Sequence, residues 1–139
     1  MAAKVTDLRS ALKMLEDMPG QLIETDVEVE PMAELSGVYR HVGAGGTVMR
    51  PTKEGPAMIF NNVKGHPGAR VAIGVLASRT RVGALLECNP KDLGKKLYHS
   101  VDNPILPILS EEAAPCQEVV HKATDPDFDL YKLVPAPTN

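Results

Sequence analysis

The sequence predicts an α/β fold in which a mixed sheet is flanked by helices. Segments with apolar residues at helical spacing alternate along the chain with short apolar runs that are typical of strands. In addition, 11 Gly and 12 Pro residues interrupt these segments with turns, which does not fit a bundle of long helices. With 139 residues, of which 43% are hydrophobic, the chain is long enough to bury a core.

The first expected elements are a helix and a strand. Thr6 or Asp7 can cap a helix that runs to about Met18, because apolar residues recur along it at helical spacing. Residues 22–29 then settle into an alternation of apolar and acidic side chains, which predicts a half-exposed strand. The side chains expected to turn inward are Val27 and Val29.

A second helix is expected to open at Pro31 and to end at the glycine-rich stretch Gly43-Ala44-Gly45-Gly46. Its apolar stripe consists of Leu35, Val38, Tyr39 and Val42.

Two buried strands and two helices follow. Residues 56–63 and 70–76 are apolar runs separated by a Gly-Pro turn, and they could form a hairpin with a long connection. Ser78 or Thr80 can cap a helix through residues 85–87. Asn89, with Pro90 at the first helical position, predicts a second helix to about Val101.

The stretch beyond these helices is expected to lead into another structural unit. Residues 104–109 contain too many prolines for a central strand, and residues 113–115 form a linker. Residues 116–121 are expected to form a strand of the next unit. The sequence therefore predicts one domain over residues 1–110, followed by the beginning of a second over residues 111–139.

Charge and composition exclude several classes of function. The net charge of −3, with basic residues scattered among acids, does not favour binding to nucleic acid. No apolar run reaches the roughly 20 residues that a membrane helix needs. Cys88 and Cys116 lack a metal-type spacing, and two lone thiols fit a reducing compartment. A cytoplasmic location without membrane partners is expected.

Few residues suggest a phosphate, metal or nucleophilic site. The glycines of residues 43–46 follow a helix, whereas phosphate-binding loops follow a strand, so they are interpreted as a helix stop. Cys88 has no visible base nearby and is interpreted as a small buried hydrophobe. The four histidines, which are isolated in sequence and lack zinc-site spacing, are His41, His66, His99 and His121.

Two charged groups leave alternatives open. Arg79 and Arg81 flank Thr80 at a helix start, where they could make a contact with another domain or molecule, face solvent, or hold an anion. A stripe of acids at period two could perform acid–base work but more often solvates a strand edge. Its members are Glu24, Asp26, Glu28 and Glu30. Residues alone thus reveal no catalytic constellation.

The last ten residues combine apolar anchors with a stiff, extended end. A turn at residues 125–130 leads into them, and two prolines follow the anchors. The anchors that we expect to be buried are Leu130, Leu133 and Val134. Because chain termini are usually loose and polar, we expect residues 130–139 to pack against further chain, and functional machinery to lie beyond Asn139.

Six segments in order resemble the N-terminal region of the UbiD family of decarboxylases. The longest is Gly55-Pro56-Ala57-Met58-Ile59-Phe60-Asn61-Asn62-Val63-Lys64-Gly65. The others are residues 7–9, 24–31, 77–81, 114–118 and 129–139. A further stretch, residues 37–47, is similar to members that act on hydroxybenzoate-type phenolic acids. Together these segments span essentially the whole chain.

The resemblance implies a longer parent enzyme that reversibly decarboxylates an aromatic acid. In this family a split β-barrel binds prenylated FMN with a divalent metal (Mn or Mg) and K, and a C-terminal α/β domain follows. Residues 111–139 would then supply the first strand of that barrel. The implied partners are the remaining domains, the aromatic acid and other copies in a homo-oligomer.

The family's catalytic, flavin-binding and metal-binding residues match no position here, so none is assigned. The chain alone is therefore expected to be inactive and to bind no flavin. Two alternatives stay open: a free-standing α/β module that binds a small ligand or a partner, and a non-catalytic subunit of a split decarboxylase.

Overall fold

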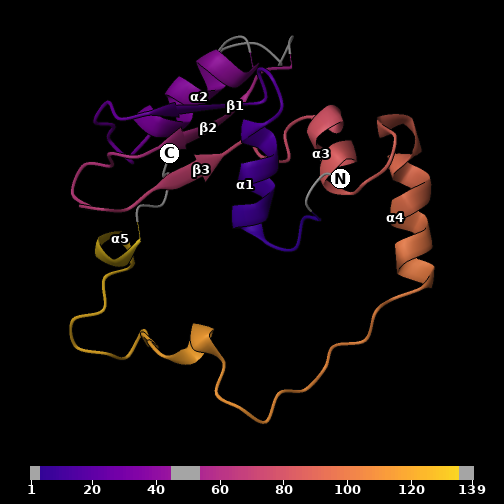
Figure 1. Cartoon of the computed structure of the whole chain (residues 1–139). Helices are drawn as coiled ribbons and strands as arrows, with labels where there is room; N and C mark the ends of the chain where they lie inside the picture. The colour runs from indigo at the N-terminus through magenta and orange to yellow at the C-terminus, as the bar shows by residue number, and fades with distance from the viewer. Residues whose placement is uncertain (1–3, 45–53, 135–139) are drawn as a thin grey trace.

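A three-stranded mixed sheet organises the molecule. The computed structural model describes residues 4–44 and 54–134, arranged as shown in Figure 1. The strands are β1 (Leu22–Thr25), β2 (Ala57–Phe60) and β3 (Val71–Ile73), in the order β1-β2-β3. β1 runs parallel to β2, and β3 runs antiparallel to β2. The predicted mixed sheet and the hairpin between its second and third strands are thus confirmed.

The helices begin largely where their caps predict. Asp7 caps α1 (Leu8–Glu16): its Oδ1 accepts from the backbone N of Ser10 at 2.7 Å, and Ser10 Oγ accepts from the backbone N of Asp7 at 3.0 Å. Ser78 caps α3 (Arg79–Leu85). Asn89 caps a 3₁₀ turn, η1 (Pro90–Asp92), which continues into α4 (Leu93–Asp102).

The second helix starts later than the sequence suggests. α2 spans Glu34–Ala44, three residues after Pro31. Ala33 adopts a φ of 63° just before it, a backbone conformation that does not continue a helix. The residues that follow α2, 45–53, lie outside the described part of the chain.

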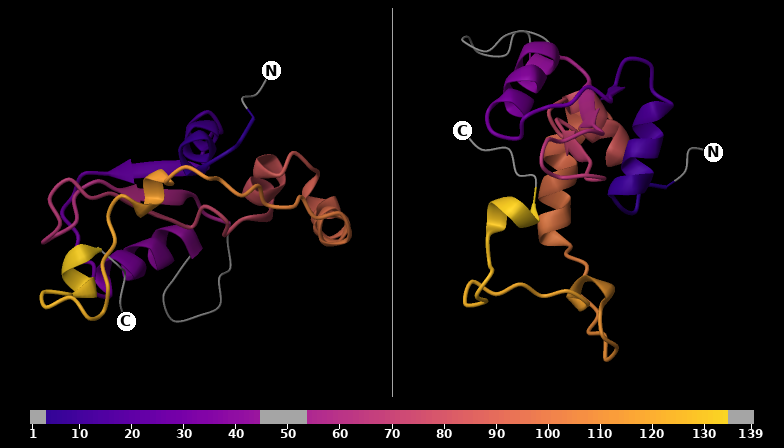
Figure 2. Two further views of the ribbon diagram at one scale, coloured as in Figure 1. Left: turned by 90° about the horizontal axis from the view of Figure 1, so that it is seen from below. Right: turned by 90° about the vertical axis from the view of Figure 1, so that its left-hand side faces the viewer.

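The core lies on both faces of β2. Figure 2 shows α1 and α2 on opposite sides of the sheet, with α3 and α4 beyond one end of it. All four residues of β2 are buried, because alternate side chains of a strand face opposite layers. The main cluster joins Val29, Leu35, Met58, Phe60 and Val63, with Tyr39, Val42, Val71 and Ile73 packed against it.

The first strand is shorter than predicted. It ends at Thr25, and Val27 is 75% exposed, so the prediction that Val27 turns inward is wrong. Val29 is buried as predicted, through an isolated parallel bridge to Val63. Val38, predicted on the buried stripe of α2, is exposed. An alternating pattern cannot show where the neighbouring strand stops, and here pairing stops at Phe60.

The stretch after α4 differs most from expectation. Residues 116–121 form no strand; a 3₁₀ turn, η2 (Pro115–Gln117), lies there instead, and residues 115–121 are exposed. A strand needs a neighbour to satisfy its backbone, and among the described residues the sheet consists of β1, β2 and β3, none of which pairs with this segment. Residues 104–109 form no strand, as predicted.

The expected anchors near the end are not buried in this chain. α5 (Leu130–Leu133) is capped by Asp129, whose side chain accepts from the backbone N of Tyr131 at 3.0 Å. Leu130, Leu133 and Val134 are 51%, 40% and 42% exposed. So short a helix gains its stability mainly from packing, and here the packing leaves Leu130, Leu133 and the following Val134 partly in water. Residues 135–139 lie outside the described part.

No helix within residues 4–44 and 54–134 has the length and apolar character needed to cross a membrane. The boundary between the two predicted domains, at residue 110, stays a prediction.

Candidate functional site

The most developed polar site in the molecule surrounds Arg81. Arg81 lies in the first turn of α3. Ser78 caps this helix, and its Oγ accepts a hydrogen bond from the backbone N of Arg81 at 3.2 Å. From there the side chain of Arg81 points into the protein, and the residue is only 1% exposed. Arginine is almost never buried to this degree without partners.

The guanidinium of Arg81 connects three segments of chain. Its Nη1 donates to Gln21 Oε1 at 3.0 Å and to the carbonyl of Gly55 at 2.8 Å. Its Nη2 donates to the carbonyl of Gly74 at 3.0 Å, and its Nε to that of Val75 at 3.3 Å. These acceptors precede β1, precede β2 and follow β3, so Arg81 holds one end of the sheet together.

Burial lowers the pKa of the Arg81 guanidinium from its usual value, because the interior disfavours the charged form. The nearby Tyr39 and Glu54 act in the opposite direction and raise this pKa. Glu54 is itself held by the hydroxyl of Ser78, which donates to its carboxylate. Within the described part of the chain, the Arg81 guanidinium is bonded to four acceptors that are all neutral groups, so dipoles and not a bonded acid solvate its charge there.

Glycine is required at two positions around this site, where segments of the chain approach one another closely. Gly55 donates its backbone N–H to the carbonyl of Gly43 at 2.9 Å, and a Cβ on Gly55 would lie 2.4 Å from that oxygen. Gly74 has a φ of +76°, and a Cβ there would lie 2.3 Å from Tyr39 Oη. The chain is therefore closely packed on the side of each glycine where a Cβ would point.

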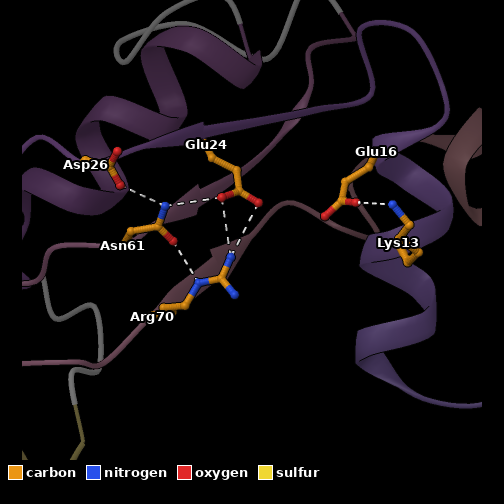
Figure 3. A network of polar contacts seen from close by, with 6 residues as sticks. All are labelled: Lys13, Glu16, Glu24, Asp26, Asn61 and Arg70. Atoms are coloured by element: carbon orange, nitrogen blue, oxygen red, sulfur yellow. Dashed lines mark hydrogen bonds and ion pairs between the residues drawn. The ribbon is translucent and has the colours of Figure 1, made fainter.

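A second polar network holds the opposite end of the sheet (Figure 3). Arg70 Nε donates to Asn61 Oδ1 at 2.7 Å, and Arg70 Nη2 lies 3.4 Å from Glu24 Oε1. Asn61 Nδ2 donates to Glu24 Oε2 at 3.2 Å and to Asp26 Oδ1 at 3.0 Å. Asn61 follows β2, Arg70 precedes β3, and Glu24 and Asp26 lie within and just after the end of β1. Unlike Arg81, the Arg70 side chain is 56% exposed.

The acidic stripe is thus divided among structural partners. Glu24 and Asp26 belong to this network, and Glu30 pairs with Lys64 at 3.0 Å, a contact that raises the pKa of Lys64. The carboxylates of Glu24 and Asp26 are thus bridged by the side-chain amide of Asn61, and that of Glu30 is paired with Lys64. Their arrangement supports the interpretation of a solvated strand edge.

The remaining candidates do not gather into a site. His41, His99 and His121 are exposed and His66 is half-buried. Cys88 is half-buried and Cys116 exposed, and both thiols are free. Within the described ranges, no group of three or more His, Cys, Asp or Glu residues could hold a metal ion. Gly45 and Gly46 lie outside those ranges.

The two arginines of α3 separate. Arg79 is exposed, whereas the guanidinium of Arg81 is engaged internally, so the pair does not converge on an anion. Sequence reasoning missed the internal role of Arg81. Its partners lie up to 60 residues away in the chain, and a basic residue in a first helical turn carries no local signal of such contacts.

An open groove of about 680 Å³ lies between α1 and β3. Its walls are largely apolar, and Leu8, Ala72 and Val75 are among them. The carboxylate of Asp7 at its rim is already bound to the cap of α1. The groove therefore offers surface for apolar contact, but no reactive group.

The chain is similar to known decarboxylases. The model of the 3-octaprenyl-4-hydroxybenzoate carboxy-lyase N-terminal domain matches residues 14–101. The chain is 56% identical to the gallate decarboxylase of Lactiplantibacillus plantarum over 140 residues, covering 100% of this chain and 29% of the relative. It is 31% identical to the phenolic acid decarboxylase of Bacillus subtilis, covering 93% of this chain and 26% of the relative.

Solved structures extend this similarity to three dimensions. The apo 3,4-dihydroxybenzoic acid decarboxylase of Enterobacter cloacae superposes with a TM-score of 0.84 at 56% identity, covering 99% of this chain and 28% of that one. The UbiD-class enzyme HmfF of Pelotomaculum thermopropionicum, in complex with prFMN, gives a TM-score of 0.71 at 26% identity, covering 94% of this chain and 27% of that one. The chain thus spans less than a third of each of these relatives.

Proposed function

The chain belongs to the UbiD family of carboxy-lyases, and from this premise we propose that it forms the N-terminal scaffold of an aromatic acid decarboxylase. The parent enzyme would reversibly remove the carboxyl group of a hydroxybenzoate-like acid, using prenylated FMN. The observation that carries the proposal is the 56% identity to gallate decarboxylase along the entire chain. A relative named for a dihydroxybenzoate shares the same level of identity.

The two arginines that hold the sheet are not available to bind the cofactor. A flavin phosphate needs free cations or backbone amides, yet the Arg81 guanidinium is occupied by four internal acceptors and Arg70 by Asn61 and Glu24. Nor do residues 4–44 and 54–134 contain a metal-type cluster. We therefore assign the flavin, its divalent metal and its K to the remainder of the parent protein, and assign no catalytic step to this chain.

The role proposed for this chain is mechanical. Arg81 and Arg70 hold the two ends of the small sheet, so the domain can present its surface to the rest of the enzyme as a rigid unit. Rigid support for an active site is what a scaffold contributes to catalysis. A homo-oligomeric, cytoplasmic enzyme is part of the same proposal.

Decarboxylation assays of the full-length protein test the proposal. The protein would be purified with prenylated FMN and incubated with 3,4-dihydroxybenzoate or gallate, and CO2 release measured. We expect CO2 release from at least one acid by the flavin-loaded full-length protein, and none from the 139-residue chain. A flavin-loaded protein that releases no CO2 from any hydroxybenzoate would refute the assignment.

The isolated chain supplies an independent check. We expect gel filtration of the 139-residue chain with prenylated FMN to separate protein from flavin. Flavin retained in stoichiometric amount would contradict the assignment of the cofactor to the remaining domains. A free-standing binding module, the alternative from sequence, predicts a self-contained surface, which the exposed residues 105–109 do not support.

A further inference from the structure

An apolar strip begins on α4 and, along the sequence, resumes past the end of this helix. Leu93, Leu97 and Val101 recur at four-residue spacing and share one face of the helix. Leu93 packs into the domain and is 6% exposed, but Leu97 is 54% and Val101 77% exposed. Exposure rises because α4 extends beyond the body of the domain, as Figure 1 shows. The helix therefore carries an apolar face that the described residues do not cover.

The chain after α4 continues this strip. Ile105, Leu106, Ile108 and Leu109 are 98%, 77%, 95% and 94% exposed. They lie in a stretch without helix or strand that runs away from the sheet (Figure 1), and no charged residue occurs from Asn103 to Ser110. Successive side chains of an extended segment point in opposite directions, so both faces of this segment are apolar.

Resting on the proposed function, we propose that this strip, Leu97, Val101 and residues 105–109, is where the remainder of the parent decarboxylase docks, enclosing residues 105–109 on both faces. An uncharged apolar surface of this kind is typical of permanent interfaces. The strip also lies where the matched N-terminal domain ends, at residue 101, while the relatives are more than three times as long as this chain.

A second copy of this chain fits the strip less well. A two-fold contact between two α4 helices would cover Leu97 and Val101, but it would leave one face of residues 105–109 in water. A domain tethered in the same polypeptide can cover both faces, and its high effective concentration keeps it docked. The two occupants therefore differ in whether neighbouring side chains 105 and 106 are both protected.

Cysteine labelling distinguishes these occupants. Ile105→Cys and Leu106→Cys would be made separately, with Cys88 and Cys116 replaced by Ser, in the full-length protein and in the 139-residue chain. Val27→Cys in the 139-residue chain supplies the rate of an exposed side chain, since Val27 is 75% exposed. Peptide mass spectrometry would measure the rate at which maleimide labels each introduced cysteine. Each rate would then be divided by the rate for the same variant in urea.

We expect labelling at both 105 and 106 to be at least about 100-fold slower in the full-length protein than in the 139-residue chain, because a docked segment must open before it reacts. Dilution should not restore the rate. Fast labelling at either position in the full-length protein would overturn the proposal. Protection in the 139-residue chain that disappears on dilution would also overturn it, in favour of a second copy.

Decarboxylation measured on the same preparations separates this inference from the proposed function. A protected strip in a flavin-loaded protein that releases no CO2 would uphold the docking and refute the activity. An active enzyme whose strip labels freely would refute the docking alone.

Discussion

Replacement of Arg81 tests whether its buried guanidinium holds the sheet together. Arg81→Met keeps an unbranched side chain of similar length but removes the four side-chain hydrogen bonds to three separate segments. The matched control is Arg79→Met, which removes the same charge from the same helix at an exposed position.

The expected loss of stability follows from the acceptors left behind. The carbonyl of Gly74 keeps a second donor, the backbone N of Ala77 at 3.0 Å, and the half-buried Gln21 can turn toward water. The carbonyls of Gly55 and Val75 lose the bond from Arg81, at a cost of about 1–3 kcal/mol each. Removing the buried charge returns part of this cost, as the lowered pKa of Arg81 indicates. We therefore expect a net loss of about 3 kcal/mol.

Urea and thermal unfolding, followed by far-UV circular dichroism, measure this loss in the 139-residue chain. For a chain of this size a loss of about 3 kcal/mol lowers Tm by about 10 °C. Arg79→Met should stay within about 0.5 kcal/mol of the unmodified protein. If Arg81→Met has the same stability as Arg79→Met, the reasoning is wrong and the guanidinium is not what joins the three segments.

Three further predictions concern other contacts. Gly74→Ala should destabilise the protein far more than Gly68→Ala in urea unfolding. Both residues have a positive φ, which costs about 1–2 kcal/mol for alanine, but only at Gly74 would the new Cβ collide with Tyr39. The pKa of Asp7 is lowered because the backbone N of Ser10 donates a hydrogen bond to its ionised form, so the contribution of Asp7 to folding stability is present above pH 3.8 and is lost as pH falls through the folded pKa. Asp7→Asn should flatten this part of the Tm-versus-pH curve, and an unchanged curve would exclude the mechanism. Arg70→Met should cost less than about 1 kcal/mol in urea unfolding, since its network is half exposed, and a loss as large as that of Arg81→Met would contradict this distinction.

Local signals predicted the caps and most element starts. Asp7, Ser78 and Asn89 act on backbone groups two or three residues away, so the sequence around each contains all of the interaction. The hairpin of β2 and β3 was predictable for a related reason, since two apolar runs flank a turn of glycines and proline.

Predictions that depended on distant neighbours were wrong. Val27 continues an alternating pattern, but the strand ends at Thr25 because pairing with β2 ends at Phe60. Residues 116–121 have strand-like composition yet form no strand here, since a strand also needs a partner. The burial predicted for Leu130 likewise required chain to pack against, and the composition of a segment does not supply it.

The sequence by itself determined the α/β class, the starts of most of its helices and, through the order of its segments, the UbiD family. Only the tertiary structure decided that Arg81 is an internal connector while Arg79 faces solvent, although both are arginines in the same short helix. It also showed that the apolar face of α4 extends beyond the domain. The physical reason is shared: a side chain's role is set by which distant groups surround it, and folding alone brings those groups together.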